Sequence, residues 1–489
     1  MGIDDHWSFS DADYHQTILE KPAPDFPKPA NGVAQSEILN SNLLHSSTDD
    51  LPDFEALTKT LVLTSEDDTF WWHATAYPFY QLIVQNGYES EQCRSLLRWY
   101  AAFIIPALGP RPIQGVKPLF QPCPVPDGSS VEHSLNWKEK SSKRLVRFTI
   151  EATGRSAGTT LDPFNQDEAV TLLSKLQRFG KMPNLDLGQF DIWKNRFFID
   201  AQTAPVLLPK LPSGLPLSQI WVAFDFPHSH EPMAKVYFMP SLSSMVSGIP
   251  NYRLVFETAR RCNGRHGNYD TAIGVLDTYL TAYPTEPVIM AALDCVDSPD
   301  SRIKVYVQTS ANTFNSAKRV LTLNGKRSGE TVQKGLEALG ELWSIIFGPD
   351  KTNDGDSTVF SSGVYCGLAV ELKADQDLPE TKLHLPVRNM EGTDADLCHL
   401  LSTWFQKRGH GTFGAGIQTN LARAFPHHDL NGPRGTYTFV SFSYSAETGV
   451  YMTMYYSTRI FDSHLGVKKE NFWQGYDSLW GKWSHDQKM

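Results

Sequence analysis

A unit of two strands followed by helix recurs along the chain, and this repeat limits the possible folds more than any other feature. Five pairs of short segments carry the β-rich, alternating patterns expected of strands. Segments with apolar residues spaced three and four apart, as in amphipathic helices, follow the first four pairs. The expected strand pairs are 131–137 with 144–152, 220–226 with 234–240, 288–296 with 302–309, 364–372 with 381–387, and 436–444 with 450–458.

Five hairpins in series make ten antiparallel strands, and an open sheet of this size would leave two exposed edges. Closing the sheet into a barrel removes those edges, and the helical segments can then cover its outer face. A ten-stranded barrel is wider than its own side chains easily fill, so it can hold a ligand. The expected fold class is therefore α/β (α+β), a ten-stranded antiparallel barrel with a ring of outer helices.

The domain organisation follows from composition. Residues 1–50 are polar, with prolines at 22, 24, 27 and 29, and are expected to form an extended arm; residues 51–489 are expected to form a single barrel domain. The N-terminus lacks the basic and apolar regions of a signal peptide, and no stretch approaches the roughly 20 apolar residues of a membrane span. The six cysteines are scattered, as reduced thiols are. We expect a cytoplasmic protein without a membrane partner.

The charge balance excludes one class of partner. The chain has 44 Lys and Arg against 54 Asp and Glu, which gives a formal net charge of −10. Binding to a nucleic acid requires a basic face that neutralises phosphates, so we expect no nucleic-acid partner. A local basic pocket is still compatible with this total, and a small anionic ligand remains possible.

A cation followed two residues later by an aromatic side chain is repeated on three of the expected strands. Residues two apart in a strand point to the same side, so each pair shares a face. If helices cover the outside, these faces look into the barrel lumen together with Arg147 and Arg302. Several cations in one lumen repel each other unless a multiply charged anion such as a diphosphate lies between them. The three pairs are Lys235-Val-Tyr237, Lys304-Val-Tyr306 and Lys382-Leu-His384.

Two further features fit the ionisation of an allylic diphosphate. Tyr451 and Tyr455 share one face of the last strand, and tyrosine rings stabilise a nearby cation by ~0.5–2 kcal/mol. Glu132, on the first strand, could accept a hydrogen bond from an aromatic N–H or O–H and later take a proton. Taken singly, each of these residues is better explained by ordinary strand packing or a solvated face; the combination favours the functional interpretation.

These residues resemble those of the fungal aromatic (indole) prenyltransferases of the dimethylallyl tryptophan synthase family. The resemblance implies a barrel of repeated αββα units, in either a monomer or a homodimer. It also implies dimethylallyl diphosphate and a small aromatic acceptor as partners, with no cofactor, because cations of the protein would replace a metal. The resemblance runs from about residue 71 to about residue 456 and rests on LGPRP, VEHSLNW, VRFTIEA, WVAFDF, KVYF, DSRIKVYV, TKLHLPV and VYMTMYYS.

The resemblance implies a role for each candidate residue. Glu132 corresponds to the glutamate that binds the indole N–H, and Thr149 to a position in the acceptor pocket. Lys382 and His384 depart from the pattern, because members of the family often have Gln and Tyr there. The implied diphosphate ligands are Arg147, Lys235, Arg302, Lys304 and Lys382. The implied prenyl-shielding residues are Tyr237, Tyr306, His384, Tyr451 and Tyr455.

One departure bears on the acceptor. Tryptophan-prenylating members carry an arginine for the amino-acid carboxylate shortly before the third-repeat cations, whereas this chain has no Lys, Arg or His between His266 and Arg302. This favours a neutral acceptor, such as a tryptophan-containing cyclic dipeptide or an indole alkaloid. Tryptophan, tyrosine and phenolic polyketides are the alternatives within the enzyme class. A non-catalytic barrel that binds an aromatic or lipid ligand is the alternative of another class, although such a carrier has no need for paired lumen cations.

A competing motif lies in the arm. Residues 49–53 spell Asp-Asp-Leu-Pro-Asp, which matches the DDxxD magnesium–diphosphate motif of helical isoprenyl synthases. That motif acts on a helix, where the first and last carboxylates share a face. Pro52 strains such a helix, so we interpret the match as fortuitous and expect no metal site.

Overall fold

The computed structural model describes residues 53–113, 116–125, 127–212, 215–228 and 231–461. The predicted polar arm and the Trp-rich C-terminal segment lie outside these residues, as does most of the DDxxD match. Asp53 is the only carboxylate of that match within the described chain, and its side chain caps helix α2 by accepting from the backbone N–H of Glu55.

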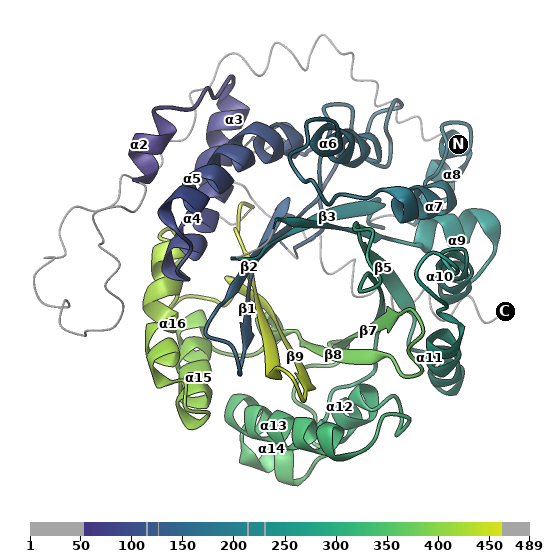
Figure 1. Cartoon of the computed structure of the whole chain (residues 1–489), viewed down its shortest axis with the longest axis vertical. Helices are drawn as coiled ribbons and strands as arrows, with labels where there is room; N and C mark the ends of the chain where they lie inside the picture. Colours follow the sequence, from purple (N-terminus) through teal and green to yellow (C-terminus); the bar gives the residue numbers. More distant parts are fainter. Residues whose placement is uncertain (1–52, 114–115, 126, 213–214, 229–230, 462–489) are drawn as a thin grey trace, which may run out of the picture. The chain divides into compact units, whose positions relative to one another are not determined.

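Ten strands form a closed barrel in which each strand pairs antiparallel with its neighbours in sequence and β1 pairs with β10 (Figure 1). The predicted barrel is therefore confirmed. The strands are β1 (Val131–Lys138), β2 (Leu145–Ile150), β3 (Ile220–Phe226), β4 (Met233–Phe238), β5 (Val288–Asp294), β6 (Arg302–Gln308), β7 (Gly367–Lys373), β8 (Glu380–Leu385), β9 (Tyr437–Ser445) and β10 (Gly449–Ser457).

Helices surround the barrel (Figure 1). The α-helices are α2 (Phe54–Thr58), α3 (Glu66–Trp71), α4 (Tyr77–Gln85), α5 (Ser90–Trp99), α6 (Asp167–Arg178), α7 (Gly188–Phe197), α8 (Ala204–Leu207), α9 (Ser241–Ser247), α10 (Asn251–Arg260), α11 (Asp270–Ala282), α12 (Phe314–Leu321), α13 (Glu330–Phe347), α14 (Pro349–Asn353), α15 (Asp394–Lys407) and α16 (Gly411–Ala424). Short π- and 3₁₀-helical turns are η2 (Trp72–Ala76), η3 (Tyr100–Ile104), η4 (Ile105–Leu108), η5 (Leu208–Lys210) and η6 (Val387–Asn389).

The core lies between the outer face of the barrel and the helices. On β6, Ile303, Val305 and Val307 are buried on that face and alternate with the polar residues of the strand. On β2, the buried Phe148 ring lies 5.3 Å from the Phe79 ring of α4 and 5.1 Å from the Tyr100 ring. Each such side chain contributes about 1.5–3 kcal/mol by leaving water. Because this core takes every second residue, the residues between them face the lumen.

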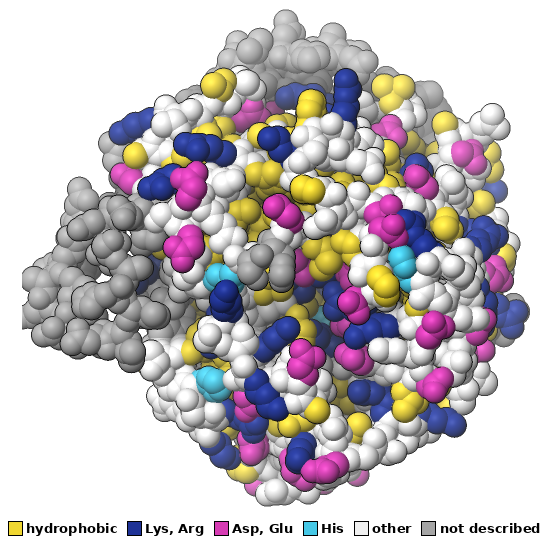
Figure 2. Space-filling model, in the orientation of Figure 1, with side chains coloured by type: hydrophobic (Ala, Val, Ile, Leu, Met, Phe, Trp, Pro, Cys, Tyr) yellow, Lys and Arg dark blue, Asp and Glu magenta, His cyan; other side chains and the backbone are white. Residues whose placement is uncertain are grey.

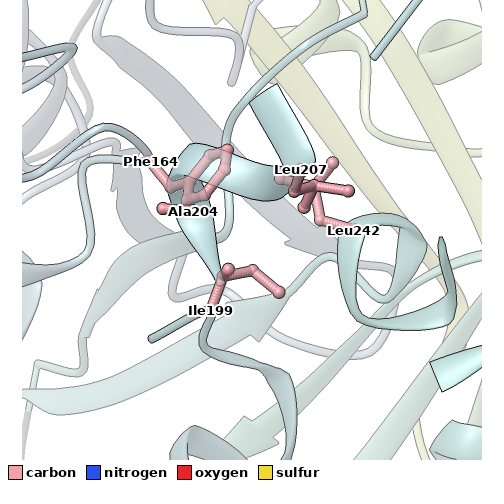
Figure 3. Packing of buried hydrophobic residues seen from close by; sticks show 5 residues of the cluster. All are labelled: Phe164, Ile199, Ala204, Leu207 and Leu242. Carbon is pink, nitrogen blue, oxygen red and sulfur yellow. The ribbon is translucent and has the colours of Figure 1, made fainter. Parts of the chain in front are cut away.

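A smaller apolar cluster joins α8 and α9 to the loops around them (Figure 3). Leu207 of α8 and Leu242 of α9 are buried in it together with Phe164, Ile199 and Ala204. This cluster holds α8 and α9 in place, because helices this short have too few residues to be stable alone.

Five predicted strands differ from the expected bounds by two or three residues: β2, β4, β5 and β8 each end two residues early, and β7 begins three residues late. Strand β5 ends at Asp294, two residues early, and its pairing with β6 shifts between Val288 and Met290. Strand β7 begins at Gly367, three residues later than expected, because the N–H of Cys366 donates to the Ala311 carbonyl instead of continuing the sheet.

Two expectations from composition can also be compared with the structure. All six cysteines are free and buried, as predicted. Among the described residues, no helix has the length and apolar character needed to cross a membrane.

Candidate active site

The lumen face of the strands carries the residues predicted for the site. On β4, β6 and β8, which run in the same direction, a lysine is followed by an aromatic residue two positions on, as the repeat predicts. In the space-filling view, basic and acidic side chains gather around a hollow near the middle of the face (Figure 2). The structure therefore brings side chains from five hairpins into one chamber.

Four aromatic rings form a continuous arc around this chamber, which we call the aromatic belt. The ring centroids of Tyr237 and Tyr306 are 5.9 Å apart, those of Tyr306 and His384 are 6.1 Å apart, and those of His384 and Tyr455 are 5.7 Å apart. The sequence analysis missed a fifth ring: Trp221 of β3 lies 6.2 Å from Tyr237, its direct cross-strand partner. The belt provides a wall of aromatic faces of the kind that stabilises a cation.

The predicted cations on β6 are held by two carboxylates that the sequence analysis did not include. Arg302 Nε donates to Asp294 Oδ2 at 2.8 Å, and Arg302 Nη1 donates to Glu371 Oε2 at 3.2 Å. Lys304 Nζ lies 3.1 Å from Glu371 Oε1. Burial alone would raise the pKa of Glu371, but Lys304 and Arg302 outweigh it and lower that pKa.

A third carboxylate, Asp225 of β3, joins the cations of β2 and β4. Its Oδ2 accepts from Lys235 Nζ, and its Oδ1 lies 3.8 Å from Arg147 Nε. Burial would raise the pKa of Asp225, but Lys235 and Arg147 hold it at about 2. The same period-two rule that found the cations, applied to β3, β5 and β7, would have found all three carboxylates.

Lys382 differs from the other cations of the cluster. Within the described chain it makes no salt bridge, and its Nζ lies 3.5 Å from the centroid of the Tyr451 ring. Burial lowers the pKa of Lys382, and the nearby Lys304, Arg147 and Arg302 lower it further against the opposing effect of Glu371. The five cations and three carboxylates together leave an excess of two positive charges, which makes this part of the lumen attractive to an anion.

Glu132 lies close to Tyr455 of the belt, beside a different set of side chains. It is opposite Thr149 of β2 in the sheet, so the structure brings the two predicted acceptor residues together. The Thr438 hydroxyl donates to Glu132 Oε1 at 2.8 Å. Burial raises the pKa of Glu132 to about 8 in spite of Thr438, Arg388 and Arg147, which lower it. At neutral pH Glu132 is therefore mostly protonated.

Strand β5 is uncharged at its middle lumen positions, although Asp294 lies at its end. Met290 and Ala292 of β5 lie opposite Tyr306 and Lys304 and occupy the lumen positions there. Arg388, in η6, places a cation near Glu132, whose pKa it lowers, with its guanidinium 5.3 Å from the Phe439 ring centroid.

Comparison with known proteins gives a consistent result. Residues 67–419 match the family model described as tryptophan dimethylallyltransferase. The prenyltransferase iacE of Pestalotiopsis fici is 35% identical over 84% of this chain and 95% of its own length. The 7-dimethylallyltryptophan synthase hasE of Aspergillus fumigatus is 29% identical over 84% of this chain and 90% of its own. The crystal structure of AnaPT from Neosartorya fischeri superimposes with a TM-score of 0.73 at 26% identity, covering 83% and 97% of the two chains.

The closed barrel with its belt and basic cluster defines an aromatic prenyltransferase, an enzyme that transfers a dimethylallyl group from dimethylallyl diphosphate to an aromatic acceptor. The chain belongs to the tryptophan dimethylallyltransferase family.

Proposed function

We propose that this enzyme prenylates a neutral, indole-containing acceptor, such as a tryptophan-containing cyclic dipeptide or an indole alkaloid, in secondary metabolism. The observation that carries the proposal is the position of the basic cluster directly beside the aromatic belt, with Glu132 close to Tyr455, the last ring of the belt. The absence of a cation at Met290 and Ala292, the middle lumen positions of β5, favours an acceptor without a free carboxylate. The relatives hasE and AnaPT, whose names specify tryptophan and indole diterpene chemistry, support an indole acceptor.

The basic cluster is proposed to bind and ionise the donor. Arg147, Lys235, Arg302, Lys304 and Lys382 supply the cations. The allylic C–O bond breaks, its electron pair leaves with the diphosphate, and the excess of positive charge stabilises the departing anion. Lys382 makes no salt bridge within the described chain, so the diphosphate anion should stabilise its charged form more than that of the other four cations.

The aromatic belt is proposed to hold the dimethylallyl cation until the acceptor reacts. The faces of Tyr237, Tyr306 and Tyr455 stabilise the cation without attacking it, whereas a carboxylate or amine would form a bond to it. Tyr451 lies between Lys382 and Lys138, at 3.5 and 5.5 Å from the two ammonium groups, and forms the boundary between belt and cluster.

Glu132 is proposed to orient the acceptor and to remove its proton. Its carboxylate accepts the indole N–H, the indole ring attacks the allylic cation through carbon or nitrogen, and the carboxylate then takes the proton that restores aromaticity. Thr149, directly opposite Glu132 in the sheet, lines the same part of the pocket.

The proposed chemistry needs no metal, because protein cations occupy the place of Mg²⁺ at the diphosphate. We expect excess EDTA to leave most of the turnover of purified enzyme intact. Abolition of activity by EDTA, with recovery on addition of magnesium, would contradict this expectation. It would support a magnesium–diphosphate site at the Asp-rich sequence of residues 49–53.

The pKa values predict a narrow pH optimum. Glu132 must lose its proton to act as a base, so the rate rises with pH up to its pKa of about 8. Burial lowers the pKa of Lys235 to about 8 against the opposing effect of Asp225 and Asp294, so the donor site loses an ammonium above that pH. Initial rates at low concentrations of both substrates should therefore peak near pH 8. A flat profile from about pH 6 to 9 would contradict both assignments.

A product assay tests the proposed function directly. The enzyme is incubated with dimethylallyl diphosphate and a panel of cyclic dipeptides, simple indoles, tryptophan, tyrosine and phenols, with products read by mass spectrometry. We expect a prenylated indole product and little reaction with free tryptophan. Turnover of phenols alone would support the phenolic alternative, and tight binding of an aromatic ligand without any turnover would support a carrier.

A further inference from the structure

On β8 and β9, two neighbouring buried polar atoms of the lumen make no hydrogen bond of good geometry to the described residues: His384 Nε2 and Ser441 Oγ. The two residues are direct cross-strand partners on β8 and β9, and Ser441 is fully buried. The Tyr455 ring lies 5.7 Å from the His384 ring. Burial raises the pKa of Tyr455, and the Ser441 hydroxyl, which lies close to the Tyr455 hydroxyl, opposes this rise. We call His384 and Ser441 the polar notch of the aromatic belt.

The polar notch is unexpected in a wall that shields a carbocation. A buried polar atom without a partner costs free energy, because it has lost the hydrogen bonds that it made in water. The imidazole is also uncharged: burial lowers the pKa of His384 to about 3, and Lys382 and Lys304 add to this effect. A neutral imidazole has one nitrogen with a lone pair, and a lone pair turned toward an allylic cation would be alkylated.

We infer that the polar notch binds an oxygen atom of the aromatic acceptor, either a hydroxyl or a carbonyl group, with His384 Nε2–H as the donor. This inference rests on the proposed function. With the proton on Nε2, no lone pair of that nitrogen faces the lumen, so the ring can stand in the belt without reacting. An acceptor hydroxyl can accept from His384 and donate to Ser441, and an acceptor carbonyl can accept from both, so one ligand oxygen satisfies both orphaned atoms.

The location of the polar notch agrees with an acceptor rather than a donor contact. His384 lies two residues beyond Lys382 on β8 and next to Tyr455 in the belt. On β9, Ser441 is three residues from Thr438, whose hydroxyl donates to Glu132. The charge of Glu132 also raises the pKa of Tyr455, so Tyr455 lies close to the predicted acceptor carboxylate as well as to the polar notch.

The test compares acceptors that differ in one oxygen. The 4-, 5-, 6- and 7-hydroxyindoles, the matching fluoroindoles and indole itself are each supplied with dimethylallyl diphosphate, and kcat/KM is measured. In the wild type, at least one hydroxyindole should exceed its fluoro partner by about 10-fold or more, since the fluoro compound leaves the notch unsatisfied.

Variants show whether the notch causes this preference. His384→Phe keeps an aromatic ring, and Ser441→Ala removes one hydroxyl; in both, the ratio of kcat/KM for the preferred hydroxyindole to that for its fluoro partner should fall toward unity. Ser443→Ala is the matched control, because Ser443 lies on the same face of β9 but donates to the Tyr451 carbonyl at 3.4 Å, and it should retain the preference.

The outcomes separate this inference from the function on which it rests. The inference is overturned if the wild type prenylates indoles with no preference for any hydroxyindole. It is also overturned if the preference survives in both notch variants, because the notch then does not bind an oxygen atom of the acceptor. If the wild type prenylates no indole at all, the proposed function fails and the inference fails with it.

Discussion

Glu132→Gln is expected to reduce aromatic prenylation by about 10²- to 10⁴-fold at about pH 8.5, while the affinity for dimethylallyl diphosphate stays near that of the wild type. Glutamine keeps the size of the side chain and one acceptor oxygen. It cannot take a proton or balance the positive charge of the alkylated ring. Because Glu132 has a pKa of about 8, the two enzymes should differ most above that pH and should converge as the wild-type carboxyl becomes protonated at about pH 6.

The measurement is the fraction of the dimethylallyl cation that reacts with the aromatic acceptor rather than with water. Ionisation precedes attack, so a cation without a well-placed acceptor is captured by water, and the ratio of prenylated product to dimethylallyl alcohol should fall in Glu132→Gln. Glu447→Gln, at an exposed glutamate in the turn between β9 and β10, is the matched control and should keep both rate and ratio. An unchanged ratio in Glu132→Gln would place Glu132 outside the acceptor site.

Lys304→Ala is expected to lower kcat/KM for the donor by about one to two decades, because a charge-assisted hydrogen bond to the leaving group contributes about 1.5–3 kcal/mol. The substitution also removes a partner of Glu371, whose Oε1 lies 3.1 Å from Lys304 Nζ. The double variant Lys304→Ala with Glu371→Gln separates the two effects. It should recover thermal stability relative to Lys304→Ala, yet its turnover should stay well below that of the wild type.

The control for this prediction is Lys334→Ala, which removes an exposed lysine of α13 that pairs with Glu330. Near-normal kcat/KM in Lys304→Ala, equal to that of the control, would show that Lys304 does not contact the donor. Recovery of full activity in the double variant would show that the lysine acts only by neutralising Glu371.

The period-two pattern predicted much of the site because, in a closed barrel, every second residue of each strand faces the lumen. Lys304 and Tyr306 alternate with the buried Ile303, Val305 and Val307, so the lumen face of β6 follows from sequence alone. The carboxylates were missed for a different reason: a search for repeated cations gives no weight to single acidic residues on the intervening strands.

Other properties of the site depend on contacts that sequence does not specify. The pKa of Glu132 reflects its burial and its approach to Thr438 and Arg388, which lie about 300 and 250 residues away along the chain. The polar notch depends on the register of β8 against β9, which places His384 opposite Ser441. The strand pattern predicts that these strands are neighbours, but it does not predict which residues pair.

The most direct test of the account is a crystal structure of the enzyme with the unreactive analogue dimethylallyl thiolodiphosphate and an indole acceptor. The account predicts the diphosphate among Arg147, Lys235, Arg302, Lys304 and Lys382, the dimethylallyl chain against the aromatic belt, and the indole N–H within hydrogen-bonding distance of Glu132. A diphosphate bound outside the lumen, or an analogue bound in the reverse orientation with its diphosphate at Glu132, would contradict it.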